Sequence, residues 1–457
     1  MEDYKSEEHF KEKILDDLSN ITLKKGAIDI ELFHKYEVKR GLRDADGRGV
    51  LVGLTEIGEV HAYIIDEGEL ISVPGRLIYR GYDIIDLAKG FMGDGRFGFE
   101  EVVYLLLFGN LPDKKELDDF KHLLCIYQKL PENFARDIIL NAPSKDIMNG
   151  LARSVLALYT FDDNPDDISV KNVLKQCIKL IASFPSLVAY SFQAYSHYHG
   201  NQSLVLHSPQ SNLSLAENIL YMLRSNHKYT DLEAKLLDLA LVLHAEHGGG
   251  NNSTFVTHVV TSTGTDTYSA IAAALGSLKG PRHGGANHKV IQMIENIKEN
   301  VKNWEDNAEV SAYLNRLLTK DAFDHSGLIY GIGHAVYSIS DPRAVVLKSY
   351  AGKLAHEKGL VNEFNLYAKI EELAPKVITQ YTNSNKAVSA NVDFYSGFVY
   401  RMLNLPIEMF TPIFALARIS GWSAHRIEEI VNAGKIIRPA YKSVERRKEY
   451  VSLNKRD

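Results

Sequence analysis

The sequence is poor in cysteine: only Cys125 and Cys177 occur among its 457 residues, and they have no CxxC spacing. Two cysteines are too few for a disulfide framework, which is typical of a reducing compartment. Long apolar runs are also missing, and the longest, such as residues 102–108, fall far short of the about 20 residues of a membrane helix. Residues 1–20 are rich in charge and lack the apolar core of a signal peptide. These absences predict a soluble, cytoplasmic protein without a membrane span.

An excess of positive charge is absent as well. Lys and Arg total 52 against 58 Asp and Glu, which gives a formal net charge of −6. Such a chain has no general attraction for nucleic acid or for an anionic membrane, so we expect neither as a partner. Any anionic ligand must therefore be held by local arginines. Hydrophobic residues make up 45%, the average of soluble globular proteins, and the length favours two or more domains of about 150 residues.

Helical periodicity dominates most of the chain. Residues 99–108 and 116–130 are predicted to form amphipathic helices separated by a turn. The clearest helix begins with a capping box from Thr230 to Glu233, and the glycines at 248–250 are predicted to end it. Its apolar face carries Leu232, Leu236, Leu239 and Leu243.

Strand-like patterning is confined to residues 53–79, where apolar residues among glycines predict short strands or a hairpin. Further helices are expected from about Asn252 and over residues 266–278, the latter ending at Gly280-Pro281. No internal repeat and no Ser/Pro-rich linker marks a domain boundary. We therefore expect an almost all-α fold with one minor hairpin near the N-terminus.

Three short segments carry residues suited to chemistry, and the first is His244-Ala245-Glu246-His247. At positions i and i+3 of a helix end, the two imidazoles would lie on one face, where the helix dipole favours a protonated histidine. This arrangement is expected of an anion site or of half a metal site, although the zincin spacing is absent. Two ordinary capping histidines are the alternative.

The second segment runs from Gly280 to Asn287 and contains Pro281, His283 and the glycine pair at 284–285. Proline fixes one backbone dihedral and the glycines expose the backbone, so His283 is predicted to stand on a stiff turn between helices. A histidine in that position can donate a hydrogen bond to a developing oxyanion. An interhelical turn with an incidental histidine is the alternative.

The third segment combines residues 331–337, which include His334, with Asp341-Pro342-Arg343 and residues 391–397. The glycines at 331 and 333 allow close approach of a ligand, and Arg343 can bind a carboxylate through two hydrogen bonds. Asp393 is an acid in a mainly apolar neighbourhood, where its basicity can be tuned. Alternatively, Asp393 is a helix N-cap and Arg343 a surface charge.

Taken together and in this order, the segments resemble the citrate synthase family over about residues 53–438. The resemblance also covers residues 77–84 (Leu-Ile-Tyr-Arg-Gly-Tyr-Asp-Ile), 99–106 (Phe-Glu-Glu-Val-Val-Tyr-Leu-Leu) and 391–418, which contains Glu408-Met409-Phe410-Thr411-Pro412. It implies a multihelical fold with a large and a small domain, working as a homodimer. We expect an N-terminal extension over residues 1–45, a large domain over 46–284 and 401–457, and a small domain over 285–400.

The resemblance implies an acyltransferase of the tricarboxylic acid cycle that condenses oxaloacetate with acetyl-CoA and hydrolyses citryl-CoA, without a metal or other cofactor. It assigns His283 to the enol of acetyl-CoA, Asp393 to the methyl proton, and His334 to the oxaloacetate carbonyl. Oxaloacetate would be held by residues at three further matching positions, His247, Arg343 and Arg418. Arg438 matches an arginine that reaches the site of the partner subunit.

The residue types suit this chemistry. A thioester methyl is a very weak acid, so a carboxylate removes its proton only if the enolate oxygen gains a donor at the same time. Two carboxylates on oxaloacetate are better matched by arginine than by lysine. One departure concerns CoA: Ser338-Ile339-Ser340 stands where many members carry a basic residue that binds phosphate. Candidates for this role are Lys348, Lys353 and the basic tail residues Lys442, Arg446, Arg447 and Lys448, although a charged run near a terminus is usually just solvated.

Three alternatives remain open at this point. A 2-methylcitrate synthase would use propionyl-CoA with the same residues, because one methylene is worth only about 1–3 kcal/mol of discrimination. A metal-dependent hydrolase would be built on His244, His247 and His258. A catalytically silent helical protein of the same fold is the third alternative, against which the presence of His283, His334 and Asp393 argues.

Overall fold

The computed structural model describes residues 2–44, 47–67, 69–334, 336–384 and 387–456. The expected boundary between residues 45 and 46, and Ala335 of the third segment, lie outside the described residues. The chain divides into two compact units, residues 1–54 and residues 55–457. The first unit contains α1 (Glu2–Gly26) and α2 (Ile30–Lys35), so this N-terminal segment is largely helical.

The second unit is mostly helical, as the sequence predicts. Its first half contains α3 (Ile84–Gly93), α4 (Phe99–Phe108), α5 (Lys114–Tyr127), α6 (Ile147–Leu158), α7 (Val170–Gly200), α8 (Leu215–Leu223) and α9 (Asp231–His244). Its second half contains α10 (Asn252–Thr261), α11 (Thr267–Lys279), α12 (Ala286–Asn300), α13 (Asn307–Leu318), α14 (Pro342–Glu357), α15 (Val361–Thr382), α16 (Val392–Met402) and α17 (Phe410–Val431).

The expected hairpin is present near the start of this unit. β1 (Gly58–Asp66) pairs antiparallel with β2 (Glu69–Tyr79), in a register that places Gly58 opposite Tyr79, and a bulge lies between His61 and Tyr63. The short β3 (Tyr82–Asp83) adds to β2. Gly75 lies so close to the loop before α14 that a Cβ atom there would come within 2.2 Å of the Ser340 carbonyl oxygen. The hairpin therefore packs against the loop that carries residues 338–340.

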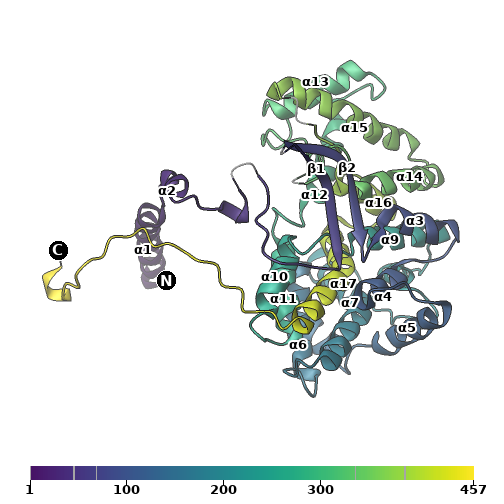
Figure 1. Ribbon diagram of the computed structural model, residues 1–457, viewed down its shortest axis with the longest axis horizontal. Coiled ribbons are helices and arrows are strands. Elements are labelled where there is room, and N and C mark those ends of the chain that lie inside the picture. The colour runs from purple at the N-terminus through teal and green to yellow at the C-terminus, as the bar shows by residue number, and fades with distance from the viewer. Residues whose placement is uncertain (1, 45–46, 68, 335, 385–386, 457) are drawn as a thin grey trace. The chain divides into compact units, whose positions relative to one another are not determined.

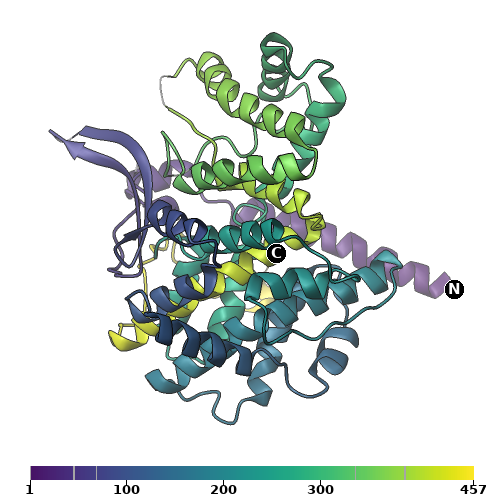
Figure 2. The same ribbon diagram turned by 90° about the vertical axis from the view of Figure 1, so that its right-hand side faces the viewer.

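The helices α9 and α17 occupy the middle of this unit, as Figure 1 shows, with α13 to α15 at one end and α4 to α7 at the other. Figure 2 shows the same separation after a quarter turn. From Phe410 to Arg426, α17 is buried except at Thr411, because its residues pack against α7, α9, α10 and α11 on several sides. A helix that is buried around its whole circumference belongs to a core.

The longest helix of the second unit, α7, has the length and composition of a membrane span, but 78% of its most apolar stretch is buried inside the protein. Its neighbours are α17, α8, α6 and α5. This burial is typical of the central helix of a globular core. The capping box at Thr230 that opens α9 is present as predicted, with the Thr230 hydroxyl accepting the Glu233 amide and the Glu233 carboxylate accepting the Thr230 amide.

Candidate active site

Backbone hydrogen bonds fix the segment that carries His334 against the segment that carries Asp393. The Gly333 amide donates to Ser389 O at 2.7 Å, and the Asn391 amide donates to Gly331 O at 2.9 Å. The Asn391 side chain also donates to Gly333 O at 2.8 Å. Gly331 has φ of +80°, and a Cβ atom there would lie 2.9 Å from the Phe394 ring, so glycine is needed at this position. The two sequence segments thus form one unit.

The ring of His334 is held in one tautomer. Its Nδ1 accepts the amide protons of Val336 at 3.0 Å and of Tyr337 at 3.1 Å. Because Nδ1 acts as an acceptor, the proton of the neutral imidazole is on Nε2. The ring also stacks on Tyr337, with centroids 4.9 Å apart, and meets the edge of His247 at 5.5 Å. His334 is therefore arranged to donate a hydrogen bond from Nε2.

Arg343 is buried and oriented by its neighbour Asp341. Its Nε and Nη2 donate to the two oxygens of Asp341 at 3.0 and 2.7 Å, and the same carboxylate caps α14 by accepting the Arg343 amide. Asp341 also accepts the Val392 amide at 3.0 Å, which joins the N-terminus of α16 to that of α14. The alternative that Arg343 is a surface charge is wrong, since 3% of it is exposed. Two helix N-termini and a guanidinium together favour an anion.

Asp393 lies in the first turn of α16, where the N-cap is Asn391. The alternative that Asp393 is itself the N-cap is therefore wrong. Burial raises the pKa of Asp393 to about 6, while the charges of Arg343 and Arg418 oppose the rise and that of Asp341 adds to it. A carboxylate with a pKa near neutrality is a suitable general base.

His283 is held on the predicted turn between α11 and α12. A Cβ atom at the adjacent Gly284 would lie 2.4 Å from the Leu278 carbonyl oxygen, so only glycine allows this turn. The Nε2 of His283 is 3.0 Å from the hydroxyl of Ser253, which accepts the indole N–H of Trp422 at 3.1 Å. Burial, aided by the charge of Arg418, lowers the pKa of His283 to about 4. The ring is thus neutral at physiological pH.

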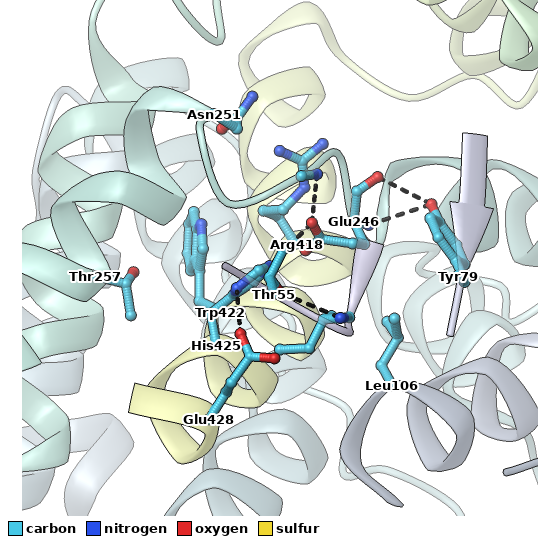
Figure 3. A network of polar contacts seen from close by, with 12 residues as sticks. Thr55, Tyr79, Leu106, Glu246, Asn251, Thr257, Arg418, Trp422, His425 and Glu428 are labelled. Atoms are coloured by element: carbon cyan, nitrogen blue, oxygen red, sulfur yellow. Dashed lines mark hydrogen bonds and ion pairs between the residues drawn. The ribbon is translucent and has the colours of Figure 1, made fainter. Parts of the chain in front are cut away.

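Arg418 lies in the middle of α17 and is completely buried, and Figure 3 shows it beside Glu246. Its Nε donates to the His244 carbonyl at 2.7 Å, but Nη1 and Nη2 are buried without a hydrogen-bond partner. Burial lowers the pKa of Arg418 to about 10, against the nearby charge of Glu246, so the group stays cationic at neutral pH. Two unsatisfied donors on a buried cation are costly and indicate an anionic ligand.

The interpretation of His244 and His247 as neighbours on one helix face is wrong. The helix α9 ends at His244, and His247 lies in the loop that follows. The reason is a tertiary contact: the Tyr79 hydroxyl lies 3.1 Å from Val242 O and 3.0 Å from Glu246 O, and it accepts the Glu246 amide. Burial lowers the pKa of both histidines, whereas the helix dipole was expected to raise it. For His247 the second cause of the lower pKa is the charge of Arg343.

His247 nevertheless belongs to the cluster. Its Nε2 is buried without a hydrogen-bond partner, and the charges of Arg343 and Arg418 both act on the ring. The charge of Arg418 also acts on His283 and Asp393. The structure therefore gathers five of the predicted residues around Arg418 or its neighbours, namely His247, His283, His334, Arg343 and Asp393.

Arg438 and the basic candidates for CoA phosphate lie elsewhere. Arg438 is exposed in the segment after α17, and its place in a second subunit stays a prediction. Lys348 pairs with Glu371, and the Lys353 ammonium lies 5.2 Å from the centre of the Tyr350 ring. Arg446, Arg447 and Lys448 are exposed in the C-terminal segment. The residues that bind phosphate stay open among these candidates.

Sequence reasoning missed the partners that orient the predicted residues. Asp341 could have been recognised from Asp-Pro at a helix start, the signature of an N-cap followed by proline at the first helical position. Ser253 gave no comparable signal. The pairing of Glu246 with His425 also gave no signal in the sequence, because the two residues are 179 positions apart. In the structure His425 Nε2 lies 3.0 Å from Glu246 Oε1.

The histidines of the metal-hydrolase alternative do not form a common metal site. Within the described residues, one group of potential metal ligands lies close together, and it consists of His258, His425 and Glu428. Their ligand atoms all lie within 4.8 Å of one another. Neither His244 nor His247 belongs to it.

Comparison with known proteins identifies the family. The family model described as "Citrate synthase, C-terminal domain" matches residues 42–440. Citrate synthase of Haloferax volcanii is 34% identical over 88% of this chain and 94% of its own length. The 2-methylcitrate synthase of Shewanella oneidensis is 30% identical over 80% of this chain and 87% of its own length. One similar solved structure is a ternary complex of citrate synthase from Thermoplasma acidophilum with carboxymethyl coenzyme A and oxaloacetate. It has a TM-score of 0.72 to this chain at 26% identity, and the match covers 92% of this chain and 99% of that one. The chain is an enzyme of the citrate synthase family.

Proposed function

We propose that this enzyme condenses oxaloacetate with acetyl-CoA and hydrolyses the citryl-CoA that results. The observation that carries the proposal is the buried, unpaired edge of Arg418, whose charge also acts on Asp393, His247 and His283. A dicarboxylic keto acid supplies what this site lacks, namely anionic acceptors for buried donors and a carbonyl that can be attacked. The ternary complex of the Thermoplasma acidophilum enzyme, which holds oxaloacetate, supports this assignment.

In the proposal, oxaloacetate binds through its two carboxylates. Nη1 and Nη2 of Arg418 bind one carboxylate, and the Nη1 edge of Arg343, whose Nε and Nη2 are used by Asp341, binds the other. His247 donates from Nε2, which is unsatisfied in the structure. Hydrogen bonds to charged groups contribute about 1.5–3 kcal/mol each, so these contacts are sufficient for specific binding.

The acetyl group is deprotonated between Asp393 and His283. Asp393 takes the methyl proton, and the negative charge that moves to the thioester oxygen is stabilised by a hydrogen bond from His283. The Ser253 hydroxyl can donate its proton either to His283 Nε2 or to the Asn251 side chain, 3.0 Å away. Donation to Nε2 places the imidazole proton on Nδ1, from which it can reach the substrate. A neutral donor is suitable here because it does not itself have to lose a buried charge.

The enol carbon then attacks the ketone carbon of oxaloacetate, and a new carbon–carbon bond forms. The ketone oxygen becomes an alkoxide, which His334 stabilises by a hydrogen bond from Nε2, the nitrogen that carries the ring proton. Water finally cleaves the citryl thioester, which releases citrate and the free thiol of CoA. No metal or other cofactor takes part in the proposed reaction.

We further propose that the small domain, residues 285–400, closes over the substrates held by the large domain, residues 46–284 and 401–457. Closure would exclude water until condensation is complete. The active form would be a homodimer in which Arg438 reaches the site of the partner subunit. A cytoplasmic location is supported by the two free cysteines, Cys125 and Cys177.

The choice between acetyl-CoA and propionyl-CoA is tested by thiol release, measured separately with each acyl-CoA in the presence of oxaloacetate. We expect the higher kcat/KM with acetyl-CoA. A higher value with propionyl-CoA would make the enzyme a 2-methylcitrate synthase, the activity of the Shewanella oneidensis relative. Thiol release should persist in excess chelator under conditions in which the treated protein stays folded, and its loss there would contradict the metal-free reaction.

A further inference from the structure

A cluster of histidine and glutamate side chains joins α10 to the C-terminal part of α17. The Nε2 of His258 lies 3.1 Å from the Nδ1 of His425. The same Nδ1 lies 3.6 Å from an oxygen of Glu428, one turn further along α17. None of these three residues is used in the proposed reaction. Figure 3 shows His425 and Glu428 on α17, below Glu246 and Arg418.

The spacing of the three ligand atoms fits a small divalent ion. In tetrahedral zinc sites the bonds to histidine nitrogen and carboxylate oxygen are about 2.0–2.2 Å, which places neighbouring ligand atoms about 3.3–3.5 Å apart. Two of the observed separations, 3.1 and 3.6 Å, lie on either side of that range, and the third, between His258 and Glu428, is at most 4.8 Å. The two rings meet edge to face, with planes at 72°. One ion can therefore contact all three side chains after small ring rotations.

Carboxylates behind the two rings direct the remaining nitrogens toward the ion position. The Nδ1 of His258 is 2.8 Å from Glu429 Oε2, and the Nε2 of His425 is 3.0 Å from Glu246 Oε1. If each outer nitrogen donates its proton to its carboxylate, both inner nitrogens present lone pairs to the same point. This carboxylate–histidine pairing is typical of zinc ligands, whose tautomer it fixes.

The third ligand is a carboxylate oxygen of Glu428. Its Oε1 accepts the Glu56 amide at 2.9 Å, whereas Oε2 is buried, lies 3.6 Å from His425 Nδ1 and has no closer hydrogen-bond partner. Three carboxylates, Glu246, Glu428 and Glu429, surround only two imidazoles. Against the opposing effect of burial, Glu246 and Glu428 raise the pKa of His425 to about 9, so without a metal this ring carries the proton that offsets part of the negative charge. A divalent cation between the same side chains would replace that proton and supply the larger positive charge.

We propose that His258 Nε2, His425 Nδ1 and Glu428 Oε2 bind a Zn²⁺ ion, with a water molecule as the fourth ligand. The ion would link α10 to α17. It would also fix Glu246 through His425, and Glu246 Oε1 accepts the Gly248 amide next to His247. The site is thus structural, and it supports the loop that carries a proposed oxaloacetate ligand. The alternative occupant is a proton shared between the two imidazoles.

Zinc binding can be measured directly on the full chain, purified without a histidine tag and stripped with chelator. Titration calorimetry with ZnCl₂ should give one ion per chain. His258→Gln and Glu428→Gln should each weaken binding at least tenfold, and Glu429→Gln, behind His258, about 10–100-fold. His122→Gln, an exposed histidine of α5, is the matched control and should bind zinc like the parent. At a fixed zinc concentration the melting temperature should rise more for the parent and this control than for the three other variants.

Cobalt substitution keeps the test valid even if a variant fails to fold. In the parent protein Co²⁺ should give the intense visible absorption of a tetrahedral site, which Zn²⁺ then displaces. The proposal is overturned if the parent binds no stoichiometric zinc, if His258→Gln binds it as tightly as the parent, or if bound Co²⁺ keeps the weak spectrum of the aqueous ion. These readouts do not depend on catalysis, so they stay separate from the proposed reaction.

Discussion

Replacement of Arg418 by methionine should have opposite effects on ligand affinity and on the stability of the unliganded protein. Methionine removes the guanidinium and retains most of the apolar volume. Two lost hydrogen bonds to a carboxylate, at about 1.5–3 kcal/mol each, correspond to a loss of about 10²–10⁴ in oxaloacetate affinity. This loss can be measured by titration calorimetry of the purified variant.

Without ligand, the same variant should be more stable than the parent. Burial lowers the pKa of Arg418 from 12.5 to about 10, so the folded state disfavours the charged form by about 3 kcal/mol at 1.36 kcal/mol per pKa unit. The lost hydrogen bond from Nε to His244 O offsets about 1 kcal/mol of this gain. The free energy of unfolding in urea should therefore rise by about 1–3 kcal/mol.

Arg426 provides the matched control, because it is equally buried on the same helix but fully paired. It donates to the Thr267 hydroxyl, the Thr261 hydroxyl and the Thr265 carbonyl at 2.8–3.1 Å. Arg426→Met leaves these acceptors unsatisfied and should cost about 2–4 kcal/mol of stability. If Arg418→Met lost stability like this control and kept its oxaloacetate affinity within threefold, a ligand-binding role for Arg418 would be refuted.

Three further predictions follow from the other site residues. Asp393→Asn should abolish thiol release. Because burial raises the pKa of Asp393 to about 6, the variant should also have a free energy of unfolding up to about 3 kcal/mol higher than the parent at pH 7, and this gain should be absent at pH 3. Equal stability of variant and parent at pH 7 would show that burial does not destabilise the charged carboxylate. In the parent, kcat/KM should fall as the pH drops through about 6, and this limb should vanish if Asp393 is not the base. Ser253→Ala should lower kcat by about 10–100-fold with little change in the KM for oxaloacetate, and an unchanged kcat would show that Ser253 does not orient His283.

Local patterns in the sequence were sufficient for the elements that depend on nearby residues. The capping box at Thr230 and the turn that carries His283 are set by residues a few positions apart, and the hairpin within residues 53–79 joins strands that are adjacent in the sequence. Asp393 was recognised as a tunable acid because its neighbours in the sequence are apolar, and burial does raise its pKa. Resemblance to a family supplied the pairing of these segments, which no local pattern contains.

Long-range contacts explain what the sequence could not provide. The helix α9 was expected to continue to the glycines at 248–250, but the Tyr79 hydroxyl, 163 positions from Val242, takes over hydrogen bonds at its end. His258 and His425 likewise meet across 167 positions. Such pairs depend on how helices pack, and a single sequence carries no periodic signal for them.

The central claim is that one carboxylate and two imidazoles act on a single acetyl group beside oxaloacetate. A crystal structure of the enzyme with oxaloacetate and an unreactive acetyl-CoA analogue tests it most directly. We predict Asp393 and His283 on opposite sides of the acetyl group, His334 Nε2 within hydrogen-bond distance of the ketone oxygen, and Arg418 paired with a carboxylate. A closed complex in which Asp393 lies out of reach of the methyl carbon, or in which Arg418 stays unpaired, would contradict the mechanism.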